Sequence, residues 1–283
     1  MASERTAGGV SYERRRLDAA ERRYWGEAWS SVPAAVAAER GIEVRRFGPV
    51  QASIAAALAD APMLNLVLGA TEPNAVAGGH LEAALAWTRE RGVSPYVQVT
   101  PDLPETEPAE AFLAASGHAP GYPWMRFVRD PHPPRFKPPA GVEVKEIGAE
   151  ASEPFGTIVA NGFGLPLWGA ALFAGLPGRE AWRCYAARVE GEVGGCAAML
   201  TDGEVALFGP SATLEAARRR GCQLALLRRR IIDAAEAGCT VLFVWTGARA
   251  EDRPAGSYRN ILRAGFEEAY LGANWRAETG SSG

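Results

Sequence analysis

The chain has 283 residues, of which 47% are hydrophobic and 22% charged, and its formal net charge is −3. This length and composition are typical of globular proteins with one or two domains and a sizeable core. The slightly acidic balance argues against a general nucleic-acid binder, and no apolar run is long enough to cross a bilayer.

The N-terminus is polar and shows no signal-peptide pattern, which favours a cytoplasmic location. The four cysteines lack the spacing of metal ligands, so we expect free thiols and no metal; they are Cys184, Cys196, Cys222 and Cys239.

The N-terminal half begins with two predicted helices between Tyr12 and Arg40. Their charged runs, Arg14–Arg16 and Glu21–Arg23, are interpreted as solvent-exposed surface. Apolar patterns then predict strands over residues 42–47, 51–58, 64–68, 95–99 and 124–128. They predict helices over residues 79–91 and 108–116, which alternate with the later strands. The alanine-rich segment 51–58 fits a helix as well as a strand.

A linker is predicted where five prolines fall between Asp130 and Pro139, because such a segment is stiff and extended. We therefore expect domains over residues 1–130 and 141–283, joined by residues 131–140.

The C-terminal half is predicted to start with a strand over residues 142–147. A helical segment follows that ends near residue 161, and a second covers residues 165–176. Three strands are then predicted over residues 182–189, 193–200 and 205–210. A helix from Leu224, a strand, a short helix and a last strand follow, over residues 224–232, 240–245, 257–263 and 266–275. Glycines at 238 and 265 mark the ends of the two helices. Pro210 within a strand pattern predicts a bulge or a local split in pairing.

The loop Arg218–Gln223 is basic, contains Gly221 and lies between a predicted strand and a predicted helix. Free backbone N–H groups and the helix dipole favour an anion at such a helix N-terminus. Since glycine lacks a Cβ, a phosphate can approach its backbone closely. The loop is a candidate phosphate site, and a solvated arginine cluster is the alternative interpretation.

The C-terminal half, from about Val142 to Ala277, resembles the GNAT superfamily of acyl-CoA-dependent N-acetyltransferases. Three segments carry the resemblance: Ser211–Leu214, Arg218–Gln223 and Arg263–Phe266. The family pattern is Arg/Gln-x-x-Gly-x-Gly/Ala in the loop and Gly-Phe after the last helix. The chain departs from it twice, because Gln223 replaces the family's Gly or Ala and Ile261 replaces its frequent tyrosine.

The resemblance implies an α/β (α+β) fold with a mixed, mostly antiparallel sheet flanked by helices. The N-terminal half repeats this order of elements, with Gly92–Gly117 matching Gly238–Gly265 in spacing, so we expect two tandem copies. Its equivalent loop, Glu72–Gly79, has no basic residue. The N-terminal copy is therefore interpreted as degenerate.

The resemblance also implies site residues. Backbone groups of the loop and of the preceding strand would hold coenzyme A, with help from polar residues of the last helix; the cofactor-binding set is Ser211, Ala212, Thr213, Arg218, Arg219, Arg220, Gly221, Cys222, Gln223, Leu224, Ser257 and Asn260. Tyr258 and Tyr270 are the candidate catalytic proton donors, in place of Ile261. Their alternative role is aromatic packing.

A general base is harder to identify. The three histidines, His80, His118 and His132, all lie outside the C-terminal domain, and Glu204 and Glu215 are expected to be exposed. Two interpretations fit the aromatic residues Trp168, Phe173 and Trp182. They line a pocket for the substrate that accepts the acyl group, or they belong to the hydrophobic core.

The function implied by the resemblance is transfer of an acetyl or small acyl group from acetyl-CoA, or another acyl-CoA, to a small-molecule or peptide amine in a ternary complex. The alternative is an acyl-CoA-sensing module without turnover, which the missing tyrosine at Ile261 keeps open. Nucleic-acid binding by the clusters Arg218–Arg220 and Arg228–Arg230 ranks last. No membrane partner is expected, and assembly as a homodimer stays open.

Overall fold

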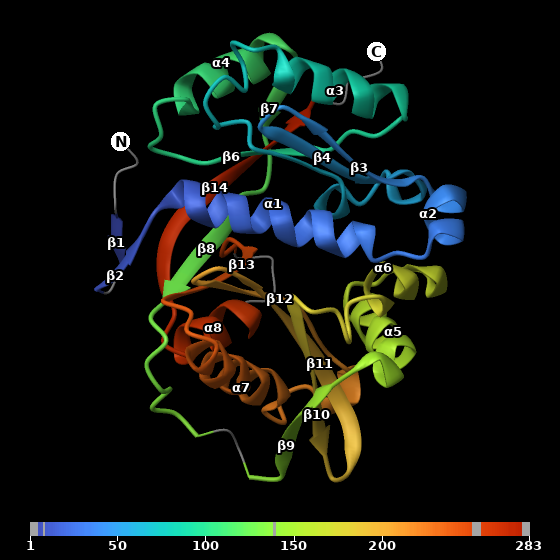
Figure 1. Cartoon of the computed structure of the whole chain (residues 1–283), viewed down its shortest axis with the longest axis vertical. Coiled ribbons are helices and arrows are strands. Elements are labelled where there is room, and N and C mark those ends of the chain that lie inside the picture. Colours follow the sequence, from blue (N-terminus) through green and yellow to red (C-terminus); the bar gives the residue numbers. More distant parts are fainter. Residues whose placement is uncertain (1–4, 8, 138–139, 251–255, 279–283) are drawn as a thin grey trace. The chain divides into compact units, whose positions relative to one another are not determined.

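The computed structural model describes residues 5–7, 9–137, 140–250 and 256–278 (Figure 1). The chain folds into two compact units, neither of which is contiguous in sequence. The C-terminal unit comprises the residues up to Glu13, Ser31–Pro33 and Arg126–Ala269. The N-terminal unit comprises Arg14–Ser30, Ala34–Met125 and the residues from Tyr270 onward.

These units differ from the predicted contiguous domains, 1–130 and 141–283, at both ends of the chain. Strand β8 (Trp124–Arg129) changes unit at Arg126, and strand β14 (Glu267–Ala277) changes unit at Tyr270. The described part of the predicted linker has no helix or strand. Each unit is therefore completed by a segment from the other half of the sequence.

The sheet of the C-terminal unit has the strand order β9-β10-β11-β12-β13-β8. Its strands are β9 (Val142–Ile147), β10 (Trp182–Val189), β11 (Glu192–Asp202), β12 (Val205–Thr213) and β13 (Val241–Gly247), besides β8. Strands β9 to β12 pair antiparallel, and β12 and β13 pair parallel. The sheet is thus mixed and mostly antiparallel, as predicted.

Helices cover both faces of this sheet (Figure 1). They are α5 (Ser152–Gly162), α6 (Ala171–Ala174), α7 (Cys222–Glu236) and α8 (Gly256–Arg263), with the 3-10 helices η3 (Ala149–Ala151), η4 (Leu167–Ala170) and η5 (Glu215–Ala217) between them. Both α5 and α7 contact β11 and β12. Seven consecutive residues of β11 are buried, which requires cover on both faces because side chains alternate along a strand.

The split predicted at Pro210 is present. Opposite Gly209 and Pro210 the register between β11 and β12 shifts, since Ala197 pairs with Ser211 but Met199 pairs with Phe208. Pairing of β12 with β13 ends at Leu207, although β12 continues to Thr213 and β13 to Gly247. The two parallel strands therefore run on without bonding each other.

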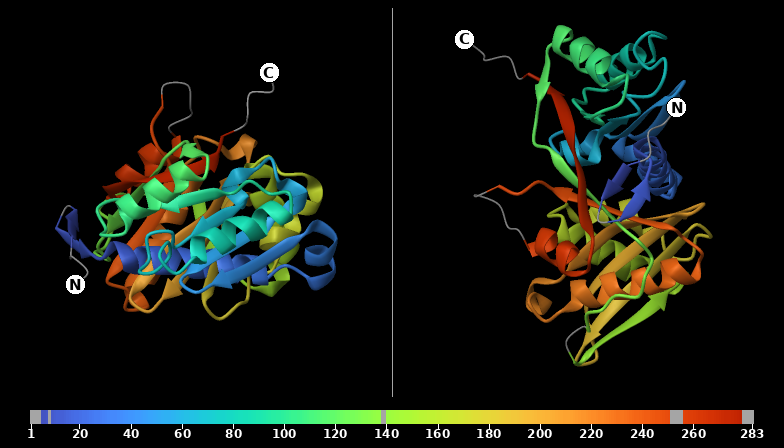
Figure 2. Two further views of the ribbon diagram at one scale, coloured as in Figure 1. Left: turned by 90° about the horizontal axis from the view of Figure 1, so that it is seen from above. Right: turned by 90° about the vertical axis from the view of Figure 1, so that its left-hand side faces the viewer.

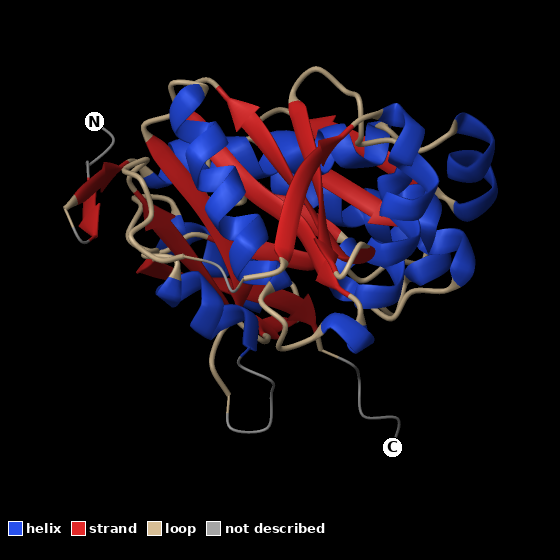
Figure 3. Ribbon diagram, turned by 90° about the horizontal axis from the view of Figure 1, so that it is seen from below, coloured by secondary structure: helices blue, strands red, loops and turns tan. Residues whose placement is uncertain are grey.

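The N-terminal unit repeats this plan, with the strand order β3-β4-β5-β6-β14. Figures 2 and 3 show the helices and strands of this unit from further directions. Its strands and helices are β3 (Ile42–Phe47), β4 (Val50–Ala55), β5 (Leu66–Leu68), β6 (Tyr96–Val99), β7 (His118–Pro120), α1 (Arg14–Ser30), α2 (Ala34–Arg40), α3 (His80–Glu90), α4 (Thr106–Ala115) and the 3-10 helices η1 (Ala56–Leu58) and η2 (Pro62–Leu64). Strands β3 to β5 pair antiparallel, and β5 and β6 pair parallel. Both units therefore contain the same succession of antiparallel strands, helix and parallel strand.

Trp275, from the C-terminal strand, belongs to the core of the N-terminal unit. Residues 273–275 of β14 pair with β6, and the side chain of Asn274 donates to the carbonyl of Tyr122 at 2.8 Å. The short strand β7, which sequence patterns did not predict, also pairs with β14. The hairpin of β1 (Arg5–Ala7) and β2 (Val10–Tyr12) in the C-terminal unit was likewise not predicted.

The prediction that the charged runs of α1 are solvent-exposed is wrong for Arg14 and Glu21, although Arg16 is exposed. Arg14 is buried, and Glu21 is 0% exposed. Glu21 accepts a hydrogen bond from Gln98 at 3.1 Å, and Arg14 donates to Asp102 at 2.7 Å. These charges are accommodated because residues far away in sequence pair with them, and periodicity within the helix gives no sign of that. No helix in the described ranges is long and apolar enough to cross a membrane.

Candidate functional site

The basic loop of the C-terminal unit has the backbone geometry of a phosphate cradle. Gly221 is the N-cap of α7 with φ of 88°, and Arg219 has φ of 64°. Both values lie in the left-handed region, which glycine adopts without strain. The turn brings the chain directly into the first turn of α7.

Four N–H groups of this loop, those of Arg219, Gly221, Gln223 and Leu224, have no acceptor in the described part of the chain. Ala225 is the first residue of the helix whose N–H bonds back, to the carbonyl of Gly221 at 3.0 Å. Unpaired amides at a helix N-terminus, together with the helix dipole, favour an anion.

The loop side chains supply positive charge around these amides. Arg218 and Arg219 are exposed, whereas Arg220 forms an ion pair with Glu190 at 2.5 Å. The Cys222 side chain is buried, and burial raises the pKa of its thiol. Leu224 is half-buried.

Gln223 connects the start of α7 to α8. Its side-chain amide donates to the hydroxyl of Ser257 at 3.0 Å and accepts from the side chain of Asn260 at 2.8 Å. The residue that departs from the family pattern thus holds two of the predicted cofactor-binding side chains. No sequence pattern indicated this contact.

Tyr258 lies on the buried side of α8, as does Ile261. Its hydroxyl donates to Glu268 at 2.6 Å, and its ring packs edge-on against Phe127. Burial, followed by the hydrogen bond to Glu268, raises the pKa of Tyr258 to about 12. Tyr258 is therefore held both by ring packing and by a hydrogen bond from its hydroxyl.

Tyr270 belongs to the N-terminal unit, whereas the loop belongs to the C-terminal unit. Its hydroxyl donates to Asp18 at 3.2 Å, and the guanidinium of Arg14 lies 4.9 Å from its ring centre. These contacts give the side chain a structural role in anchoring β14.

Ser211, Ala212 and Thr213 follow the split in β12. Ala212 is buried and the other two are half-buried. Small residues surround them: a Cβ on Gly195 would lie 2.7 Å from the carbonyl oxygen of Ala212. This strand end is therefore closely packed on the β11 side and unpaired on the β13 side.

The carboxylates considered as bases, Glu204 and Glu215, are exposed, in agreement with the prediction. Of the described residues, no group of three or more His, Cys, Asp or Glu side chains could hold a metal ion.

The equivalent loop of the N-terminal unit also ends in a left-handed glycine, Gly79, with φ of 70°. Three of its amides have acceptors within the loop: Gly78 bonds to Asn74, Gly79 to Val76, and Leu81 to Ala75. Glu82 adds a negative charge in the first turn of α3. Counted from the N-cap glycine, Gly79 and Leu81 correspond to Gly221 and Gln223, whose amides have no acceptor in the described part of the chain, so the two loops differ at these positions.

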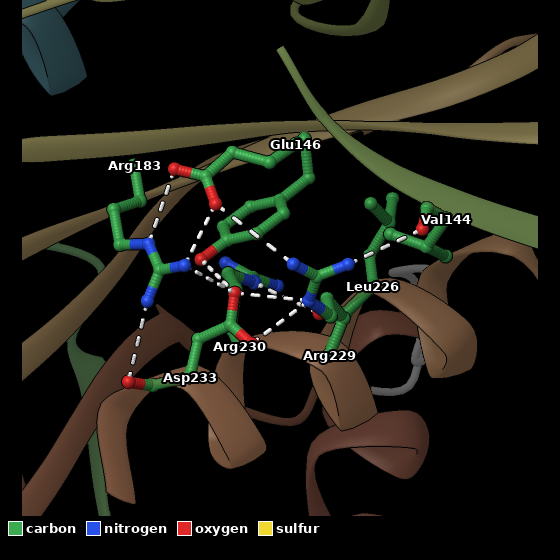
Figure 4. Close-up of polar contacts among 8 residues, drawn as sticks. Val144, Glu146, Arg183, Leu226, Arg229, Arg230 and Asp233 are labelled. Carbon is green, nitrogen blue, oxygen red and sulfur yellow. Dashed lines mark hydrogen bonds and ion pairs between the residues drawn. The ribbon is translucent and has the colours of Figure 1, made fainter. Parts of the chain in front are cut away.

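Two members of the second arginine cluster, Arg229 and Arg230, make contacts that hold the C-terminal unit together. Arg230 is 2% exposed and donates to the carbonyl of Ala198 at 3.0 Å. Arg229 binds Asp233 at 2.8 Å, and Arg183 binds both Asp233 and Glu146 (Figure 4). This network ties α7 to β9 and β10.

Comparisons with known proteins point to one fold. No family model and no curated protein matches the sequence. Among solved structures, a GCN5-related N-acetyltransferase from Kribbella flavida matches with a TM-score of 0.62 at 17% identity, over 94% of this chain and 96% of that one. One from Sphaerobacter thermophilus matches with a TM-score of 0.56 at 16% identity, over 81% and 76%.

A third match is a tandem GNAT protein from the clavulanic acid biosynthesis pathway, with a TM-score of 0.52 at 19% identity, over 83% of this chain and 79% of that one. The chain thus has the fold of the GNAT N-acetyltransferases, and the predicted resemblance is confirmed at the level of fold.

Proposed function

We propose that this GNAT-fold chain transfers an acetyl or small acyl group from acyl-CoA to an amine by direct attack in a ternary complex, and that the C-terminal unit carries the reaction. One observation carries the proposal: unpaired loop amides at the start of α7 lie in the same unit as the split between β12 and β13. The first feature suits a pyrophosphate, and the second leaves backbone groups of β12 free for an extended ligand arm.

The cradle residues divide the binding between backbone and side chains. The amides of Arg219, Gly221, Gln223 and Leu224 would receive the pyrophosphate, with Arg218 and Arg219 adding charge. Backbone groups of Ser211–Thr213 would hold the pantetheine arm and the acyl carbonyl. For Ser257 or Asn260 to reach the ligand, Gln223 must release them or bind alongside.

The reaction forms a nitrogen–carbon bond and breaks the carbon–sulfur bond of the thioester. Nitrogen loses a proton and the departing thiolate gains one. Holding both reactants in one site can supply much of the rate, because positioning replaces an unfavourable encounter in solution. Backbone N–H groups of β12 directed at the carbonyl oxygen would stabilise its developing negative charge.

Tyr258 stays the candidate proton donor on α8, although two features limit it. Its proton is held by Glu268, and its pKa of about 12 lies above the roughly 8.5 of an ordinary thiol. Transfer from the tyrosine to the thiolate would be uphill by about 5 kcal/mol at 1.36 kcal/mol per pKa unit. A water molecule, with a pKa of about 15.7, is a weaker acid still. We therefore expect the thiolate to depart largely unassisted and to exchange protons with the bulk solvent afterwards.

The direct test is release of free thiol from acetyl-CoA in the presence of a panel of primary amines, with calorimetry of CoA binding alongside. Turnover with at least one amine is expected. Binding without turnover would favour the second candidate, an acyl-CoA-sensing module, which is supported by the buried Ile261 in place of the family's tyrosine. A chain that binds no CoA would contradict both.

A further inference from the structure

The stretch that includes most of α5 and continues to Gly178 carries no charged side chain. Residues 154–178, 25 in all, contain no Asp, Glu, Lys, Arg or His. Part of the segment is ordinary core, since Phe173 and Leu172 are buried. Trp182, further along, is core as well, so these aromatics do not wall an open pocket.

The turn between α5 and η4 is different, because its apolar side chains face solvent. Leu167 is 89% exposed and Phe163 is 40% exposed. The backbone is nevertheless fixed, since Leu165 bonds to Ala160 at 2.9 Å and Gly169 bonds to Pro166 at 2.8 Å. Exposed apolar groups on a fixed turn favour a binding surface over a core segment.

This turn begins beside the strand that the proposed function assigns to the thioester. Gly162, the last residue of α5, packs so closely on β12 that a Cβ there would lie 2.5 Å from the Cβ of Ala212. Phe163 follows it directly, and its ring lies 5.9 Å from that of buried Phe173. Figure 1 shows α5 alongside β12. An acceptor that reaches the carbonyl from this side meets apolar surface first.

We infer that the acceptor is a primary amine with an apolar carbon skeleton, which Phe163 and Leu167 contact while the nitrogen reaches toward Ser211–Thr213. The inference rests on the proposed function and names its substrate class. A polyamine or amino sugar would need carboxylates to replace the water around its charges. The turn offers none, and Glu153 lies at the opposite end of α5, about 13 Å away at 1.5 Å per residue.

The test is a series of linear amines from ethylamine to hexylamine, with 1,4-diaminobutane as the polar comparison, at saturating acetyl-CoA. Full burial of one methylene contributes about 0.8 kcal/mol, so kcat/KM should rise by up to roughly fourfold per methylene. Leu167→Ser and Phe163→Ser should each flatten this rise without changing CoA affinity. Met63→Ser is the matched control, since Met63 is 44% exposed but belongs to the N-terminal unit, and it should leave the series unchanged.

A flat series in the parent protein, a preference for 1,4-diaminobutane, or an unchanged rise in both variants would overturn the inference while leaving acyl transfer intact. A dimer that Leu167→Ser dissociates would also overturn it, because a second copy would then cover the turn. If no amine is turned over, the proposed function fails, and calorimetry of hexylamine with the CoA-bound protein decides the inference separately. Saturable binding that Leu167→Ser abolishes would support it, and no binding would overturn it.

Discussion

Gly221→Asp tests the cradle, and Gly238→Asp is its matched control. The two glycines flank the same helix, α7, with similar φ values of 88° and 78°. An aspartate at either position adopts a left-handed backbone at a cost of about 1–2 kcal/mol. Only Gly221 lies at the N-terminal end, where the unpaired amides are. The pair therefore separates backbone strain from loss of the anion site.

The expected loss of CoA affinity follows from the added charge. Two unit charges about 5 Å apart interact by roughly 1 kcal/mol at the permittivity of water and about 3 kcal/mol at an effective permittivity of 20. A carboxylate at Gly221 also competes for the free amides of the loop. About 3 kcal/mol in total weakens binding on the order of a hundredfold.

Calorimetric titration with CoA measures this effect, and thermal unfolding measures the strain. Gly221→Asp should weaken binding about a hundredfold, whereas Gly238→Asp should change it by less than about twofold. Both should lower the melting temperature by a few degrees. Equal losses of affinity in the two variants, or no loss in Gly221→Asp, would refute the assignment of the loop as the phosphate site.

Three further substitutions test other parts of the structure. Tyr258→Phe should lower turnover about tenfold at most, because Glu268 holds the proton; a loss of 10²–10⁴-fold would identify Tyr258 as a general acid. Because the pKa of Tyr258 is raised, its contribution to stability is complete below about pH 10 and is lost as the pH rises toward 12. The free energy of unfolding of Tyr258→Phe should therefore depend less on pH in that window. An unchanged pH dependence would contradict the raised pKa. Asp233→Ala removes the acceptor shared by Arg183, Arg229 and Tyr185. It should lower the free energy of unfolding, measured in urea, by about 2–4 kcal/mol. A decrease below about 0.5 kcal/mol would show that the network contributes little. Trp275→Ala should destabilise the N-terminal unit by about 3–5 kcal/mol, and loss confined to the C-terminal unit would contradict the assignment of β14.

The fold of the C-terminal half could be predicted because its signals are local. Strands β9 and β10 match their predicted bounds, and glycines 238 and 265 follow α7 and α8 in the left-handed conformation. The split at Pro210 could be predicted as well, because proline removes a donor from the strand ladder.

Other features depend on residues distant in sequence and could not be predicted from periodicity. Glu21 is buried because Gln98 lies against it, and Asp18 because Thr100 and Tyr270 donate to it. The bridge from Gln223 to α8 and the engagement of the Tyr258 hydroxyl by Glu268 are of the same kind. The placement of Tyr270 in the N-terminal unit follows from strand pairing of β14 with β6, which no local pattern indicates.

Amide hydrogen exchange with and without acetyl-CoA tests the central claim most directly, because the claim concerns particular N–H groups. Bound acetyl-CoA should slow exchange at Arg219–Leu224, whose amides are otherwise largely without acceptors. The equivalent loop of the N-terminal unit, residues 74–81, bonds the amides of Gly79 and Leu81 internally and has no lysine or arginine, so it should show no change. Protection at residues 74–81 instead, or no added protection at Arg219–Leu224 when acetyl-CoA is bound, would contradict the account.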